Sequence, residues 1–386
     1  MRNYTTTFKI MESEISRYEL QKSIDFFQGD KHVRTLKTGQ LFNSLLFAQT
    51  MNCFSIREIE HSLYANANKL YHNGMTSIKR STFADALEKR DYRIFQMVYE
   101  KLLNKACAWA GRAKRHFDNP LKIIDSTSLE VNVNKFNWAL YRQTKGGMKL
   151  HVCYDPDTAL MRQMFFTDGK CPDIKRLNSF AYDKGDILVF DRGYCDYNSL
   201  YVIELNQGLF VTRVKKNACY AIDQVFSTSQ TDCIRKDMAI SFKGHRASKE
   251  YPKSLRVVEF FDQERNRSFS FLTNDFKRSA NEIADIYKER WQIELFFKWL
   301  KQNLKIKTFW GTSRNAVLIQ IWVAMILYLL IWIMKAKNAI ELSLQRIRQV
   351  LKTTLLSKQS GDALFRPPSP VYNPNFEPSL FGDSLC

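Results

Sequence analysis

Two short apolar runs, each followed by an aspartate, decide the fold: residues 187–191 read ILVFD, and residues 121–125 read LKIID. Runs of this length and composition are typical of strands buried in a sheet. A carboxylate at the end of a buried strand is costly unless it is solvated, paired or bound to a metal. Turns also favour Asp, so either residue alone could simply end its strand. The two together, Asp125 and Asp191, indicate that a rigid sheet holds functional carboxylates at its strand ends.

The elements around these runs follow the order strand, strand, strand, helix, strand, helix, strand. Three successive strands can form a meander, and the later strands then require α/β crossovers. This order predicts an α/β protein with a ribonuclease-H-like core. The expected strands are residues 121–125, 149–154, 160–166, 187–190 and 209–214, and the expected helices are residues 173–182 and 197–206.

The N-terminal segment, residues 1–118, shows helix signals separated by tight turns. Residues 39–51 are apolar with helical spacing, and Ser55 stands three residues before Glu58 in a capping-box pattern. We expect a helical N-terminal domain that binds DNA. Its short helices fit a helix-turn-helix arrangement, and they fit a plain helical bundle as well.

The rest of the chain divides into four further segments. Alternating β-branched and aromatic residues predict a mainly β insertion, and the proline-rich end predicts an extended tail. The expected segments are the first part of the core at 119–214, the β insertion at 215–276, a C-terminal helical part at 277–355 and the tail at 356–386.

The chain is strongly basic. Lys and Arg number 58 against 39 Asp and Glu in 386 residues, a formal net charge of +19. This charge favours a polyanionic partner, most commonly nucleic acid, although a Lys-rich surface for solubility is the alternative. The 45% apolar content excludes a mostly disordered chain. The eight cysteines lack zinc-ligand spacing and residues 1–30 lack a signal-peptide pattern, so we expect free thiols in a reducing cytoplasm.

One apolar segment tests the expectation of a soluble protein. Residues 316–334 have Gln320 as their only strongly polar side chain, and their length just suffices to span a bilayer. A helix that is apolar on all sides can also lie in the core of a large protein. Because the remainder of the chain is basic and polar, we favour the core helix and expect no membrane association.

A long helix expected over residues 279–303 offers a third carboxylate. Tyr287, Glu294 and Lys301 are seven residues apart, and Arg290 joins them on the same face of the helix. A carboxylate from this face would complete an oxygen-ligand cluster suited to Mg²⁺ or Mn²⁺. The alternatives are a solvated Glu294 and a purely stabilising ion pair between Arg290 and Glu294.

The spacing Tyr287-x2-Arg290-x3-Glu294-x6-Lys301 resembles the Y-R-E-K signature of a large family of bacterial insertion-sequence transposases. The surrounding residues 287–313, YKERWQIELFFKWLKQNLKIKTFWGTS, are similar to this family beyond the four signature positions. Residues 125–127 (DST), residues 191–194 (DRGY) and the helical N-terminal segment resemble it too. The resemblance covers about residues 1–355.

The resemblance implies a DDE transposase, in which Asp125, Asp191 and Glu294 form the catalytic and metal-binding triad for Mg²⁺ or Mn²⁺, with two ions in each site. It also implies DNA contacts by Tyr287, Arg290 and Lys301, and we assign Arg192 to the same role. Better-known members stack a flipped base on a Trp of the β insertion. Residues 200–286 contain no Trp, so no residue is assigned to that role.

The implied activity is cut-and-paste transposition in the bacterial cytoplasm. The protein would bind the terminal inverted repeats, free a 3′-OH at each end and join it to target DNA, with a dimer assembled on the DNA. Two alternatives are a catalytically inactive DNA-binding descendant and a ribonuclease-H-like nuclease that cuts without joining. The intact set of three carboxylates argues against the first, and the Y-R-E-K face argues against the second.

Overall fold

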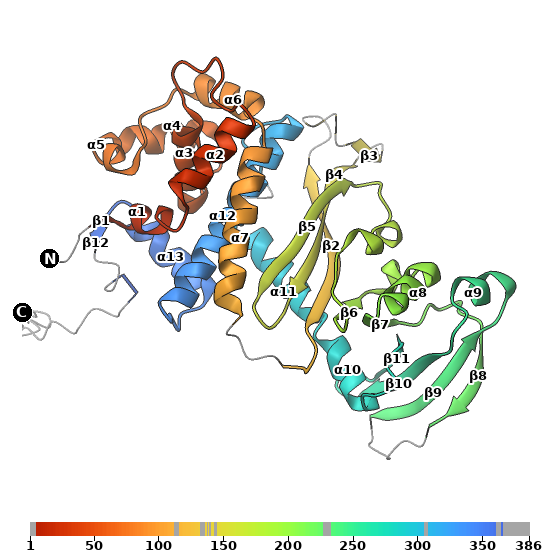
Figure 1. Cartoon of the computed structure of the whole chain (residues 1–386). Coiled ribbons are helices and arrows are strands. Elements are labelled where there is room, and N and C mark those ends of the chain that lie inside the picture. Colours follow the sequence, from red (N-terminus) through yellow and green to blue (C-terminus); the bar gives the residue numbers. More distant parts are fainter. Residues whose placement is uncertain are drawn as a thin grey trace, which may run out of the picture.

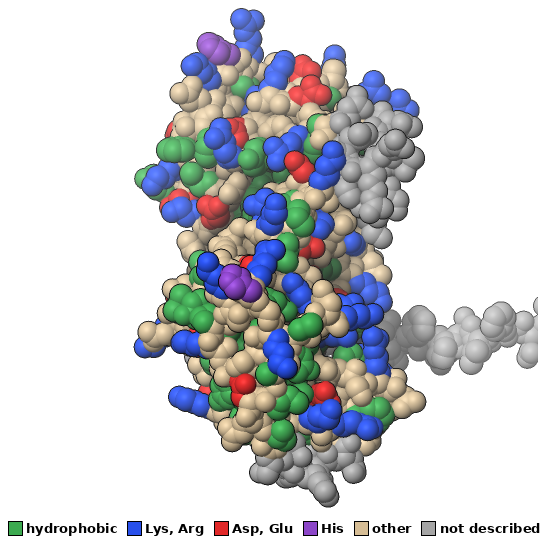
Figure 2. All heavy atoms as spheres, turned by 90° about the vertical axis from the view of Figure 1, so that its right-hand side faces the viewer, with side chains coloured by type: hydrophobic (Ala, Val, Ile, Leu, Met, Phe, Trp, Pro, Cys, Tyr) green, Lys and Arg blue, Asp and Glu red, His purple; other side chains and the backbone are tan. Residues whose placement is uncertain are grey.

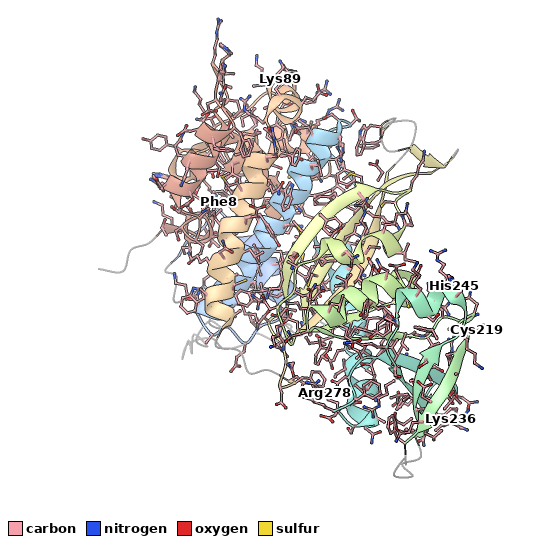
Figure 3. All side chains as sticks on the ribbon, turned by 45° about the vertical axis from the view of Figure 1, so that its right-hand side comes forward. Phe8, Lys89, Cys219, Lys236, His245 and Arg278 are labelled. Atoms are coloured by element: carbon pink, nitrogen blue, oxygen red, sulfur yellow. The ribbon has the colours of Figure 1, made fainter. Side chains whose placement is uncertain are left out.

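The computed structural model of the protein describes residues 5–111, 116–131, 136, 138, 140–142, 145–226, 233–304, 308–359 and 364–365. A helical part, a central sheet and a β-rich extension follow one another across the molecule (Figure 1). Lys89 marks the far tip of the helical part, and Lys236 lies at the opposite end of the molecule (Figure 3). The prolines of the expected tail lie in residues 366–386, outside the described residues.

The helical part is built from helices of 4 to 18 residues separated by turns, as the turn signals predict. The helix expected over residues 39–51 is α3, and Ser55 caps α4 by accepting a hydrogen bond from the Glu58 backbone N–H at 3.2 Å. Both expectations are confirmed. The helices are α1 (Thr7–Glu12), α2 (Arg17–Phe26), α3 (Thr38–Met51), α4 (Ile56–Ala65), α5 (Ala67–Leu70), α6 (Arg80–Lys89) and α7 (Arg93–Ala110), with a 3₁₀ turn, η1 (Tyr71–Asn73).

The apolar helix α12 (Arg314–Lys337) joins the helical part to the sheet. It packs along α7 and also contacts α3 and α6 (Figure 1). Although it is long and apolar enough to cross a membrane, 94% of its most apolar stretch is buried inside the protein. Gln320 is fully buried and satisfied, because its amide bonds the Trp310 backbone N–H and the Thr308 carbonyl. These contacts favour the core-helix interpretation over the membrane span.

The central sheet begins as a meander and continues with parallel strands, as predicted. Along its hydrogen-bonded order, β5, β4 and β2 are antiparallel neighbours, and β6 and β7 then run parallel to β2. The strands are β2 (Leu121–Val131), β3 (Leu140–Arg142), β4 (Lys145–Asp155), β5 (Leu160–Asp168), β6 (Ile187–Phe190) and β7 (Leu209–Arg213), and α8 (Tyr197–Leu205) connects β6 to β7.

The expectation that a strand ends at Asp125 is wrong, because β2 continues to Val131. The reason lies in its two neighbours. Parallel pairing with β6 stops at Ile124 opposite Phe190, whereas antiparallel pairing with β4 extends to the end of β2. Asp125 therefore lies where β2 parts from β6, directly beside the end of β6 that precedes Asp191.

The expected β insertion does not form a separate sheet. Its strand β11 pairs antiparallel with β7, so the central sheet continues into it, and β8 forms the outer edge. The insertion also contains one short helix that the sequence pattern did not predict. Its elements are β8 (Tyr220–Val225), β9 (Ile234–Phe242), α9 (His245–Glu250), β10 (Leu255–Asp262) and β11 (Arg267–Thr273). His245, in α9, lies in its outer part (Figure 3).

Two helix predictions are wrong in detail. Residues 173–182 form two 3₁₀ turns, η3 (Asp173–Lys175) and η4 (Leu177–Ser179), because the Asp173 side chain is drawn to Lys149 and Ser126 of the sheet. The long helix over 279–303 is interrupted at Glu289 and Arg290. Its two halves are α10 (Ala280–Lys288) and α11 (Trp291–Asn303).

The C-terminal part returns to the start of the chain. Helix α13 (Leu344–Thr354) packs on α12, and β12 (Lys358–Gln359) pairs with β1 (Thr5–Thr6). The first residues of the predicted tail are thus folded. The described cysteines are free thiols, as expected.

Glu14, in the turn between α1 and α2, links α7 to α12 and offers a test of this packing. It is 8% exposed and accepts hydrogen bonds from Lys105 of α7 at 2.5 Å and Lys337 of α12 at 2.8 Å. Burial opposes its ionisation, but the two lysines outweigh burial and lower the pKa of Glu14. Its stabilising effect is therefore present above the unfolded-state pKa and lost as the pH falls through the folded-state pKa.

We expect Glu14→Gln to lower the free energy of unfolding by about 1–3 kcal/mol at pH 7, because two lysines lose a charged acceptor. Urea denaturation at pH 7 and at pH 4 measures this effect, which should shrink at the lower pH. Glu19→Gln is the control, since its ion pair with Lys101, at 3.9 Å, is half-exposed. Equal losses in both variants would contradict the prediction.

Candidate active site

The alternation of side chains along β2 determines which face of the sheet carries Asp125. Ile123 packs in the core cluster that contains Ile293 of α11, whereas Ile124 packs on the opposite face with Phe190. Side chains two residues apart in a strand share a face, so Asp125 lies on the face that α11 covers. Asp191 comes two residues after Val189 and lies on the same side of the sheet as that residue. Val189 packs against α10 residues such as Ile283.

The guanidinium group of Arg290 lies between two of the predicted triad carboxylates. Its Nη1 donates to Asp125 Oδ2 at 3.3 Å, and its Nη2 donates to Glu294 Oε1. Asp125 Oδ1 also accepts the Ser126 backbone N–H at 2.8 Å. Asp191 caps a 3₁₀ turn, η5 (Arg192–Tyr194), by accepting the Gly193 backbone N–H at 3.0 Å. The ion pair considered from the sequence is therefore present, and Asp125 extends it into a bridge.

The third carboxylate, that of Asp191, is close enough to affect the pKa of Asp125. The pKa of Asp125 is raised to about 6, chiefly by burial and in smaller part by the charges of Asp191 and Glu294, against the lowering effects of the Ser126 N–H and Arg290. Three carboxylates thus share one region with one guanidinium. Oxygen ligands of this kind suit Mg²⁺ or Mn²⁺. Among the residues that the structure describes, however, no three acidic, His or Cys side chains converge closely enough to hold a metal ion. The carboxylate oxygens suit a divalent cation, and Arg290 bonds two of the three carboxylates, those of Asp125 and Glu294.

The remaining predicted residues are Tyr287, Arg192 and Lys301. Tyr287 is buried at the end of α10, and its ring centre lies 5.9 Å from the Arg290 guanidinium carbon. Arg192 begins η5 next to Asp191, and Lys301 lies about two turns beyond Glu294 on α11. Because α10 and α11 are separate helices, the single face predicted from the seven-residue spacing does not run through one continuous helix.

A cavity of about 370 Å³ opens beside Tyr287 and Arg290. It is both aromatic and basic, and the sequence reasoning missed it. In β10 and β11, Phe260 pairs with Phe269 and Asp262 pairs with Arg267, so alternating residues of neighbouring strands build one wall. The lining residues are Arg213, Phe260, Asp262, Arg265, Arg267, Phe269, Phe271, Tyr287, Lys288, Arg290 and Trp291.

Cations lie against the aromatic rings of this cavity, which we call the aromatic–arginine pocket. Arg213 and Arg267 lie 5.1 and 5.5 Å from the ring centre of Phe269, and Arg265 lies 5.9 Å from that of Trp291. Such a combination binds planar, anionic groups well. The signal in the sequence was the alternation of Arg267, Phe269 and Phe271. Lys and Arg side chains are also spread over the face shown in Figure 2, more densely than acidic ones.

The comparisons with known proteins identify the family. A family model described as a transposase DDE domain matches residues 116–330, and a second model, described as a domain of unknown function, matches residues 4–76. A Sinorhizobium fredii protein named as a transposase is 33% identical over 294 residues, with 74% of this chain and 80% of that protein covered. A Geobacillus stearothermophilus protein named as a transposase for insertion sequence element IS5377 is 30% identical over 335 residues, with 86% and 85% covered.

A solved structure supports the fold independently. The piggyBac transposase, in a synaptic complex with hairpin DNA, superimposes with a TM-score of 0.52 at 10% sequence identity, with 92% of this chain and 81% of that chain covered. This likeness shows a shared fold. The family match spans more than half of the chain and contains Asp125, Asp191 and Glu294. The chain therefore belongs to the DDE transposases of insertion sequences and is an enzyme of that family.

Proposed function

We propose that the protein binds the terminal inverted repeats of its insertion sequence, cleaves the DNA at both ends and joins each 3′-OH to target DNA. The observation that supports this most is the position of Asp125 and Glu294, both bonded by the Arg290 guanidinium, with Asp191 at the adjacent end of β6. The strand order β5-β4-β2-β6-β7 is that of a ribonuclease-H-like core. Within the DDE transposases, we assign the protein to the Y-R-E-K family.

Asp125, Asp191 and Glu294 are proposed to be the catalytic residues and the ligands of the metal ions. Two Mg²⁺ or Mn²⁺ ions, when bound, would activate the attacking oxygen and stabilise the leaving 3′-oxygen. The chain itself supplies the position of each carboxylate: β2 and the end of β6 hold the two aspartates, and α11 holds the glutamate. Because hydrolysis and joining are both in-line phosphoryl transfers, one set of ligands serves both steps.

We assign the DNA contacts to the residues that surround these carboxylates. Arg290, Lys301 and Arg192 would bind phosphates, since guanidinium and ammonium groups pair with them directly, and Tyr287 would donate its hydroxyl. The helical N-terminal part would read the inverted repeat, and the basic surface would supply salt-dependent affinity. Two element ends are cut together, so a dimer on DNA is expected, in the bacterial cytoplasm.

The aromatic–arginine pocket is proposed to hold an unstacked nucleotide of the transposon end. Its rings can stack on a base, and its arginines can pair with the flanking phosphates. Trp291 lines the pocket and is 50% exposed, and we assign to it the role of the Trp that residues 200–286 lack. This assignment makes a hairpin intermediate feasible.

A cleavage assay tests the proposal. The purified protein is mixed with labelled duplex DNA that carries the terminal repeats flanking its own gene, with Mg²⁺ or with EDTA. We expect metal-dependent cutting at the repeat boundary that leaves a free 3′-OH. A control duplex with a scrambled repeat should stay intact. Specific binding without cutting would instead favour a DNA-binding descendant, and cutting without joining to a target plasmid would favour a nuclease.

A further inference from the structure

The positive charge of Arg290 lies between two carboxylates that come from different elements. Asp125 belongs to β2 and Glu294 to α11, and the guanidinium bonds both. The Arg290 side chain is only 16% exposed. Its backbone N–H is held by the Tyr287 carbonyl at 3.1 Å, in the turn that separates α10 from α11. The main chain is thus fixed, so any movement of the guanidinium has to come from rotation about the side-chain bonds.

The bonds of this guanidinium are incomplete. Its contact with Asp125 is long, at 3.3 Å, and its Nε is buried without a hydrogen-bond partner among the residues that the structure describes. A planar guanidinium is best satisfied by a bidentate partner, and a phosphate group offers one. Arg290 also lines the aromatic–arginine pocket, where four further cations lie. The Arg290 guanidinium can therefore bind a phosphate instead of the carboxylates when an anionic strand enters that pocket.

We propose that Arg290 is an internal counter-ion, which occupies the carboxylate cluster in the free protein and leaves it for a DNA phosphate, so that binding of the transposon end and binding of the divalent cation are coupled. This inference rests on the proposed metal-binding role of Asp125, Asp191 and Glu294. In the free protein the guanidinium and a divalent cation compete for the same oxygens. Once a phosphate holds the guanidinium, all three carboxylates are available. The coupling is reciprocal, so Mn²⁺ also strengthens end binding.

The test measures Mn²⁺ affinity rather than activity. Electron paramagnetic resonance of free Mn²⁺ reports how much of the ion the protein binds, with and without a duplex carrying the terminal repeat. The same duplex without protein gives the background of Mn²⁺ held by DNA alone. We expect wild-type protein to bind Mn²⁺ at least about tenfold more tightly with the duplex than without it, because a nearby positive charge is removed from the site. Arg290→Met should show the tight affinity without DNA and gain little from it.

Lys288→Met is the matched control. Lys288 is a cation two residues away that lines the same pocket, but its partner is Asp285 at 2.9 Å and not a triad carboxylate. We expect its Mn²⁺ affinity without DNA to equal that of the wild type. If Arg290→Met behaves as Lys288→Met does, the counter-ion role is overturned.

The outcomes also separate this inference from the proposed function. Weaker Mn²⁺ binding in Asp125→Asn, together with equal binding by the wild type and Arg290→Met, keeps the metal site and overturns the counter-ion. Unchanged Mn²⁺ binding in Asp125→Asn overturns both. If Arg290→Met does not fold, the two wild-type measurements decide: equal affinity with and without the duplex overturns the coupling.

Discussion

Asp125→Asn is expected to reduce cleavage of the transposon end by at least about a thousandfold while leaving the fold intact. The amide has the shape of the carboxylate but not its charge, so a metal ligand is lost without creating a cavity. Asp191→Asn and Glu294→Gln should act in the same way. Gel-based cleavage of labelled end DNA measures the loss, and a mobility-shift assay should show that end binding persists.

The stability of Asp125→Asn provides a second readout. Burial and two neighbouring carboxylates raise the pKa of Asp125 to about 6, so the folded state holds its proton more tightly than the unfolded chain does. Ionisation of Asp125 therefore costs stability as the pH rises through this range. We expect the variant to be more stable than wild type at pH 8, with the difference vanishing near pH 4. Thermal unfolding at the two pH values measures it.

Asp285→Asn is the control for these variants. Asp285 lies on α10 in the same segment, but it is exposed and paired with Lys288. The Asp285→Asn variant should cleave the transposon end at the wild-type rate. Cleavage near the wild-type rate by Asp125→Asn, Asp191→Asn or Glu294→Gln would remove that residue from the triad.

Trp291→Ala is expected to lower end cleavage by about tenfold to a hundredfold, since stacking of one base on an aromatic ring contributes about 1–3 kcal/mol. A fluorescent base analogue placed in successive positions at the repeat boundary reports unstacking directly. Its signal should rise on binding to the wild type and rise much less on binding to the variant. Trp291→Phe keeps an aromatic face and should retain most of the activity.

Leu295→Ala serves as the matched control for the pocket. Leu295 is 51% exposed, one turn beyond Trp291, and does not line the pocket. A loss in Leu295→Ala equal to that in Trp291→Ala would show that the effect comes from the exposed face of α11 and not from the pocket.

The parts of the fold that depend on local pattern could be predicted from the sequence. The run at 187–190 forms β6, and Ser55 with Glu58 begins α4. The interruption at Glu289 and Arg290 could not, because both residues keep near-helical backbone angles and the apolar period continues across it. The interruption shows only in the backbone hydrogen bonds, which here join residues three apart. The Arg290 N–H donates to the Tyr287 carbonyl, and the Gln292 N–H donates to the Glu289 carbonyl.

The rest of the candidate site depends on contacts between distant segments. The aromatic–arginine pocket exists because β10 and β11 pair in one register and because α10 crosses their face, with Tyr287 against Phe271 at 4.7 Å between ring centres. Likewise, Asp173 leaves a helix-like pattern because Lys149 bonds both of its oxygens. Neither feature has a signature within a single stretch of sequence.

The position of α12 has a consequence for synthesis of the protein. Phe8, Phe42 and Phe95 of the helical part share one core cluster with Ile326 and Leu330 of α12. A nascent chain that has emerged only as far as the sheet thus still exposes the apolar faces of α1, α3, α6 and α7 that α12 covers. The part that we expect to recognise the repeat becomes complete only when α12 has left the ribosome. Premature termination before residue 314 would leave a fragment suited to degradation rather than one that competes for the transposon ends.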